Sequence, residues 1–207
     1  MSDAAVDHHL SPEEEARSID NQKFGMWLFI SSETILFSVM IAAYAVFRFQ
    51  NPDTVKAVHD ALGLGGILLV TFNSFLLLAS SWAMVMGLRR IQRDDSKGMI
   101  RWLGLVAGLG VAFVGLQAYE YMQLAEKQVT LSFSSDAFAG FGMHFYAPTA
   151  FHGAHVIIGV LWCLEVMRRA SKGRYSARNH AGVEVFGLYW HFVDVVWVVL
   201  FTLIYLI

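Results

Sequence analysis

The fold is decided by the stretch Tyr189-Trp190-His191-Phe192-Val193-Asp194-Val195-Val196-Trp197. It lies within an apolar run, 184–206, that is long enough to cross a bilayer. It nevertheless carries an imidazole and a carboxylate at positions i and i+3, which share one face of a helix. A carboxylate near the middle of a membrane helix costs several kcal/mol unless it pairs with another group or faces the interior of a helix bundle. The stretch therefore predicts a membrane helix whose polar face meets other helices.

The composition is that of an integral membrane protein. Of the 207 residues, 56% are apolar and only 15% are charged, whereas a soluble domain of this size carries about 25% charged residues. The net charge of -2 and the absence of a long basic tract argue against a nucleic-acid partner. The acidic segment 1–22 lacks the basic start and apolar core of a cleavable signal peptide. The first membrane helix is therefore expected to act as its own insertion signal.

Five apolar segments are long enough to span a membrane. They predict an all-α, polytopic membrane protein, a bundle of five transmembrane helices near 24–47, 64–88, 99–121, 141–167 and 184–206. Residues 1–22 are expected to form a solvated tail and residues 23–207 one membrane domain. Gly104 and Gly108 form a GxxxG pair in the third segment, which predicts close packing of helix backbones there.

Basic residues predict the orientation of the bundle. Of the 15 Lys and Arg, twelve fall before the first helix, between the second and third, or between the fourth and fifth, regions that share one side of the membrane. The other three, Arg48, Lys56 and Lys127, fall on the opposite side. Because basic residues are enriched on the cytoplasmic side, the N-terminus is predicted inside and the C-terminus outside.

Several polar residues have membrane depths close to the midplane, counted at about 1.5 Å per residue. Glu33, His152 and His155 share a thin slab with His191 and Asp194, and are candidate partners for Asp194. Gln117 and Glu120 lie outside this slab, nearer the outer end of the third helix. We include them in the buried polar set as well.

Three interpretations of this set compete. The residues could hydrogen-bond across helices and hold the bundle together, each bond contributing about 0.6–2 kcal/mol. They could form a proton relay, the usual role of ionisable groups buried in membranes. They could also bind a metal or haem through His152, His155 and His191. The metal interpretation has the weakest support, because the chain supplies neither a thiolate nor a second carboxylate–histidine motif.

Five stretches resemble subunit III of the haem-copper terminal oxidases, the cytochrome c oxidase and quinol oxidase subunit 3 family. They occur in the family's order, and the resemblance extends over about residues 24–206. They are FGMWLFISSE (24–33), NSFLLLASS (73–81), GLQAYEY (115–121), FHGAHVIIG (151–159) and the stretch 189–197. The chain corresponds to the short, five-helix bacterial form. It lacks the two N-terminal helices of the long form, which make one wall of a V-shaped phospholipid cleft, so a full cleft would need a neighbouring subunit.

This resemblance implies a non-catalytic accessory subunit of a proton-translocating respiratory oxidase, without a catalytic centre, haem, copper or other metal of its own. Haem and copper would belong to partner subunits. Subunit I would be the direct neighbour, subunits II and IV further members of the complex, and phospholipid a bound component. The subunit would stabilise subunit I and support proton uptake in a prokaryotic plasma membrane. Glu33 corresponds to the family's carbodiimide-reactive glutamate, which implies a carboxyl that stays protonated in its apolar site.

Two questions stay open at the sequence level. The electron donor of the complex could be cytochrome c, which the residues around Glu33 and Tyr189 favour, or a quinol. From another class of protein, a free-standing small proton or solute transporter would use the same buried polar groups as its path. Co-purification with a haem-bearing large subunit distinguishes an oxidase subunit from such a transporter.

Overall fold

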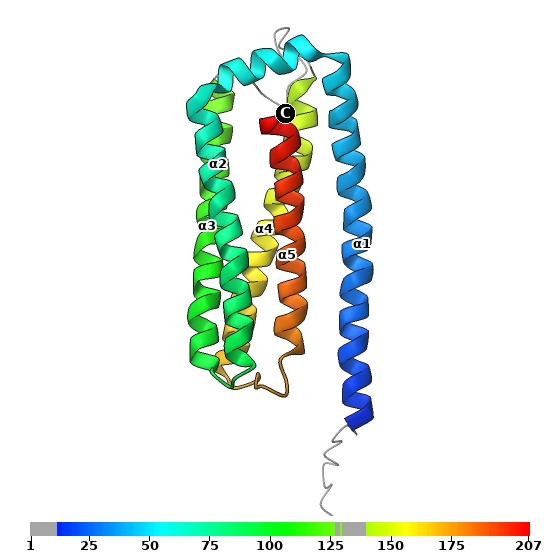
Figure 1. Ribbon diagram of the computed structural model, residues 1–207, viewed down its shortest axis with the longest axis vertical. Helices are drawn as coiled ribbons and strands as arrows, with labels where there is room; N and C mark the ends of the chain where they lie inside the picture. Colours follow the sequence, from blue (N-terminus) through cyan, green and yellow to red (C-terminus); the bar gives the residue numbers. More distant parts are fainter. Residues whose placement is uncertain (1–11, 127–128, 130–139) are drawn as a thin grey trace, which may run out of the picture.

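The computed structural model describes residues 12–126, 129 and 140–207, and this part of the chain forms a helical bundle (Figure 1). Its helices are α1 (Pro12–Gln50), α2 (Pro52–Ile91), α3 (Ser96–Glu126), α4 (Phe141–Ser171) and α5 (Ala181–Phe201), with α5 continuing into a short π-helix, η1 (Thr202–Leu206). Each of α1 to α5 contains an apolar stretch of membrane-spanning length. The predicted all-α bundle of five membrane helices is therefore confirmed. Residues 1–11 of the predicted tail lie outside the described residues, and residues 12–22 belong to α1.

Helix α2 consists of two parts that meet at Gly63. This residue has φ 62° and ψ 179°, a backbone conformation that glycine adopts far more readily than other residues. The first part crosses one end of the bundle (Figure 1, cyan), and the second starts where the predicted span begins. The crossing part buries Val58, and His59 Nε2 lies 2.9 Å from the carbonyl oxygen of Ile204 in η1. It therefore closes this end of the bundle over α5.

The five helices form an uneven bundle. Helices α2 and α3 pack along each other, α4 and α5 lie next to them, and α1 stands on the far side against α4 and α5 (Figure 1). The outward face of α1 exposes large apolar side chains, among them Phe24, Trp27, Ile35 and Val39. An apolar outward face is expected of a helix that contacts lipid or another membrane subunit.

Helix α5 supplies much of the core through its aromatic residues. Trp190 and Trp197 are fully buried. Their indole N–H groups donate to hydroxyls of α2, Trp190 to Ser80 at 3.0 Å and Trp197 to Ser74 at 2.9 Å. Buried indoles need such partners because an unpaired N–H in an apolar site is costly. The two bonds hold α5 in a fixed rotation against α2.

The predicted Gly104–Gly108 pair is not where an added side chain would clash most. An added Cβ at Gly108 would meet nothing within 4 Å, because this glycine is exposed at the outer face of α3. At Gly110 it would lie 2.9 Å from the Trp190 ring, and at Gly159 2.7 Å from it. Gly110 and Gly159 therefore make room for Trp190, as Gly153 does for Gln117, and the GxxxG expectation fails at Gly108.

One end of the bundle, which we call the basic end, carries the start of the first span, the α2–α3 connection and the α4–α5 connection (Figure 1). The connections contact each other where the Ala177 N–H donates to Asp94 Oδ1 at 2.6 Å. An ion pair between Lys23 and Glu184, at 2.6 Å, joins α1 to α5 near this end. The regions predicted to share one side of the membrane thus lie together in the structure.

Candidate functional site

Glu33 and His155 form a pair between α1 and α4. Glu33 Oε2 lies 3.4 Å from His155 Nε2, and their side chains are 13% and 9% exposed. His155 Nδ1 lies 2.9 Å from the Phe151 carbonyl oxygen, to which it donates. In a neutral imidazole Nε2 is then the acceptor, so a hydrogen bond with Glu33 requires a protonated carboxyl. Glu33 Oε2 has no partner with hydrogen-bond geometry among the described residues, so the pair is loosely held.

His152, one turn away on the same helix, meets different neighbours. Its Nε2 lies 3.2 Å from the Val193 carbonyl oxygen of α5. Its ring lies 4.8 Å from that of Trp197 and 5.6 Å from that of Phe113, measured between ring centroids. The side chain is fully buried, and its Nδ1 has no partner within the described part of the chain.

His191 and Asp194 share a face of α5, as their i, i+3 spacing predicts, and that face meets Ser81 of α2. The His191 Nδ1 and Ser81 Oγ atoms are 2.6 Å apart, and the Ser81 hydroxyl lies beside the Asp194 carboxyl. Asp194 is 4% exposed, yet neither carboxyl oxygen has a partner with hydrogen-bond geometry in the described ranges. The expected partners Glu33, His152 and His155 make no hydrogen bond to it there. The side chain that interacts with it is that of Ser81 instead.

Gln117 and Glu120 take part in a separate network of hydrogen bonds towards the other end of the bundle. Tyr205 donates to Glu120 Oε1 at 2.8 Å. The Gln117 amide donates to the Thr149 carbonyl oxygen at 3.1 Å and to the Tyr121 hydroxyl at 3.2 Å. The Tyr121 hydroxyl in turn donates to Thr149 Oγ1 at 2.8 Å. This network joins α3 to α4 and to η1, the π-helix that ends the bundle.

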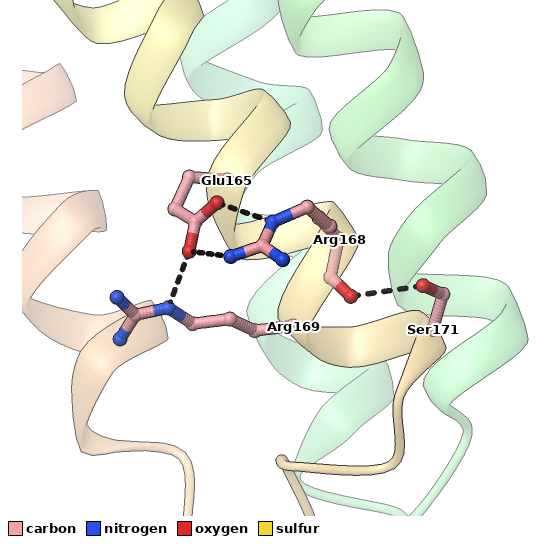
Figure 2. Close-up of polar contacts among 4 residues, drawn as sticks. All are labelled: Glu165, Arg168, Arg169 and Ser171. Carbon is pink, nitrogen blue, oxygen red and sulfur yellow. Dashed lines mark hydrogen bonds and ion pairs between the residues drawn. The ribbon is translucent and has the colours of Figure 1, made fainter.

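An exposed ion cluster lies at the basic end of α4. Figure 2 shows Glu165 accepting two hydrogen bonds from the Arg168 guanidinium, at 2.6 and 2.8 Å, and one from Arg169 Nε at 2.8 Å. The arginines lie one turn after the glutamate along the helix, the order that favours such pairs. The cluster is solvated, and we assign it to helix-end stabilisation.

The histidines do not converge on a common ligand position. His155 faces Glu33 and α1, His152 faces α5, and His191 faces Ser81 of α2. Over the described ranges, no three His, Cys, Asp or Glu side chains lie close enough together to hold a metal ion.

Comparison with known protein families shows to which family this chain belongs. The family model described as cytochrome c oxidase subunit III matches residues 3–207. This chain belongs to that family. The cytochrome c oxidase subunit 3 of Synechocystis sp. is 39% identical over 189 residues, which cover 91% of this chain and 76% of the relative.

Other members of the subunit III family match nearly end to end. The cytochrome c oxidase subunit 3 of Thermostichus vulcanus is 35% identical over 205 residues, covering 98% of this chain and 92% of the relative. The quinol oxidase subunit 3 of Bacillus spizizenii is 31% identical over 182 residues, covering 88% and 85%. Both kinds of oxidase subunit are therefore related to this chain over most of its length.

Two important polar partners in this subunit III chain were not among the predicted site residues. Ser81 interacts with both His191 and Asp194, and Tyr205 donates a hydrogen bond to Glu120. The sequence holds a signal for the first, because Ser74 and Ser81 are seven residues apart and therefore lie on one face of an otherwise apolar helix. No comparable signal marks Tyr205, whose position depends on the turn of the chain into η1.

Proposed function

We propose that this chain is the accessory subunit III of a bacterial haem-copper oxidase, without a catalytic centre or redox cofactor of its own. The observation that carries the proposal is the family match over residues 3–207. The apolar outward face of α1 supports it, because a partner subunit could cover that face in a complex. Residues 23–207 act as one membrane domain, preceded by a solvated tail over residues 1–22.

Cytochrome c is the proposed electron donor of the whole complex. The relatives named cytochrome c oxidase subunit 3 are 33–39% identical to this chain, and those named quinol oxidase subunit 3 or probable quinol oxidase subunit 3 are 28–31% identical. The purified complex should oxidise reduced cytochrome c faster than a reduced quinol. The opposite preference would assign the chain to a quinol oxidase.

The proposed setting is the plasma membrane, with the basic end towards the cytoplasm. The split of twelve basic residues against three supports this orientation. Subunit I is the direct neighbour, with subunits II and IV in the same complex. A hollow of about 230 Å³ beside His155, lined by apolar side chains that include Phe29 and Trp162, offers a place for the acyl chain of a phospholipid.

Within the complex, some buried polar residues have a structural role and others a proton-related role. The network around Gln117 and Glu120 holds helices together. The groups around Glu33, His152, His155, His191 and Asp194 include atoms that have no hydrogen-bond partner among the described residues, and they support proton uptake. The proposal concerns the subunit's contribution to stability and proton supply, not oxygen chemistry.

Affinity purification through a tag on this chain tests the proposal. A gentle detergent extract should yield a large haem-bearing subunit in stoichiometric amount, recognised by its absorption spectrum. A matched strain with an untagged chain controls for non-specific capture. A chain that purified alone, folded, and moved protons across liposomes would overturn the oxidase assignment and favour a small transporter.

A further inference from the structure

Asp194 is a buried acid placed next to a hydrogen-bonded serine and histidine. Asp194 is 4% exposed, and within the described part of the chain its carboxyl lacks a hydrogen-bond partner of good geometry. Ser81, beside it, is 2.6 Å from His191 Nδ1. A serine hydroxyl has one hydrogen and two acceptor lone pairs. It can therefore donate to His191 while accepting from a protonated Asp194, or donate to Asp194 while accepting from His191.

A groove leads to His191 from the basic end. Its volume is about 360 Å³, and its walls come from α1, α2 and α5, with Trp27, Leu88 and Leu188 among them. The Lys23–Glu184 ion pair lies at one end. His191 follows Glu184 by seven residues and so lies about 10 Å further along α5, with Asp194 about 4.5 Å beyond it. Because Nδ1 is engaged by Ser81, Nε2 is the His191 nitrogen left for groove water.

We propose that Asp194 exchanges its proton with the aqueous phase at the basic end through Ser81, His191 and water in the α1–α2–α5 groove. This deepens the proton-related part of the proposed function and rests on it. The groove volume of about 360 Å³ corresponds to about twelve water molecules at roughly 30 Å³ each. The ion pair at one end and the imidazole further in supply the polar contacts that such water needs.

Each proton transfer in the exchange has a named donor and acceptor, so the number of protons balances. Water in the groove gives a proton to His191 Nε2, and the proton on Nδ1 passes to Ser81 Oγ. The hydroxyl proton of Ser81 then moves to the Asp194 carboxylate, which becomes the neutral acid. One proton has entered at Nε2, one has arrived at Asp194, and the imidazole has changed tautomer. The reverse sequence releases the proton and restores the first tautomer.

The same groove could instead hold an acyl chain, because most of its wall is apolar. A chain seated there would exclude water and isolate His191 from the basic end. The two occupants differ in one measurable property, the rate at which the Asp194 proton is replaced by deuterium.

Infrared spectroscopy of the purified oxidase complex measures that rate. The carboxylic-acid C=O band that disappears in Asp194→Asn belongs to Asp194, and its shift after transfer to D2O reports exchange. We expect exchange at least tenfold slower in His191→Phe, which removes the relay, and in Leu188→Trp, which fills the groove without altering Ser81, His191 or Asp194. Val195→Trp, a bulky change at an exposed position of α5, is the matched control and should exchange like the unmodified protein.

Two results would overturn the proposal. One is the absence of an Asp194 acid band; the other is exchange in Leu188→Trp within twofold of the unmodified complex. Subunit stoichiometry and the haem spectrum confirm assembly of each variant, and Leu188→Trp decides the matter if His191→Phe fails to assemble. Either negative result leaves the oxidase assignment intact, because co-purification tests that assignment separately.

Discussion

The two buried carboxyl groups of the bundle interior, Glu120 and Asp194, have opposite surroundings. Glu120 accepts a 2.8 Å hydrogen bond from Tyr205 and neighbours the bonded set of Gln117, Tyr121 and Thr149. Asp194 is equally buried, but both of its oxygens lack hydrogen-bond geometry within the described residues. Burial of a polar group stabilises a fold only when the group is paired. The comparison therefore assigns a structural role to Glu120 and leaves Asp194 free for proton chemistry.

The largest effect is expected from Glu120→Leu. The change leaves the buried Tyr205 hydroxyl without its acceptor, which should lower the free energy of unfolding by about 1–3 kcal/mol. Resistance of this chain to a protease pulse across an SDS titration of the purified complex measures the loss. Tyr205→Phe in the Glu120→Leu background should add less than it does alone, since both changes remove one bond. Full additivity would argue against that bond.

Gly153→Ala should show the next largest effect, measured as the difference from a matched control, because the added methyl group would clash with Gln117. An added Cβ at Gly153 would lie 2.7 Å from Gln117 Oε1, so the amide that bonds Thr149 and Tyr121 must move. Gly108→Ala is the matched control, since its Cβ would meet nothing within 4 Å. Both changes gain a similar helix propensity, about 1 kcal/mol. The Gly153 variant should be less stable than the Gly108 variant by about 1 kcal/mol or more in the same assay, and equal stability would show that Gln117 moves freely.

A smaller effect is expected from Ser81→Ala. It removes the 2.6 Å contact to His191, and membrane hydrogen bonds of this kind average about 0.6 kcal/mol. The unfolding free energy should fall by about that amount, while exchange of the Asp194 proton slows. Ser80→Ala is a useful contrast, because it deprives the Trp190 indole of its acceptor without touching His191. It should destabilise more and leave exchange unchanged.

Glu33→Gln should change stability least, by less than about 0.5 kcal/mol, because the 3.4 Å contact with His155 lacks hydrogen-bond geometry and such loose pairs contribute little. The substitution should instead change the reactivity of this site towards a carbodiimide. A membrane-soluble carbodiimide should label Glu33 in the unmodified complex, as mass spectrometry of peptides can show. Labelling that persisted at the same level in Glu33→Gln would locate the reactive carboxyl elsewhere.

Much of this arrangement could be predicted from the sequence, and the part that could not has a physical cause. Apolar run length predicts the five spans, and the i, i+3 spacing of His191 and Asp194 predicts their common face. Depth along a helix follows from residue count, but rotation about its axis depends on packing. Trp190 and Trp197 set that rotation through their bonds to Ser80 and Ser74. Asp194 thereby faces Ser81 rather than Glu33 or the histidines of α4.

The network around Gln117 and Glu120 likewise depends on packing that the sequence does not report. The depths of Gln117 and Glu120 in the third helix place them in the buried set, but their partners come from Thr149 in α4 and from Tyr205 in η1. The crossing part of α2 contacts η1 through His59 and the carbonyl oxygen of Ile204. Apolar run length predicts neither the place of η1 nor its contact with Glu120.

The contrast between the two carboxyl groups is tested most directly by measuring Glu120→Leu and Asp194→Leu side by side. Unfolding free energies come from the same SDS titration with protease pulses, on complexes of verified stoichiometry. We predict a loss of about 1–3 kcal/mol for Glu120→Leu. For Asp194→Leu we predict a change within about 0.5 kcal/mol, since neither carboxyl oxygen has a partner of good hydrogen-bond geometry among the described residues and Ser81 keeps its contact with His191. A larger loss for Asp194→Leu than for Glu120→Leu would contradict the account.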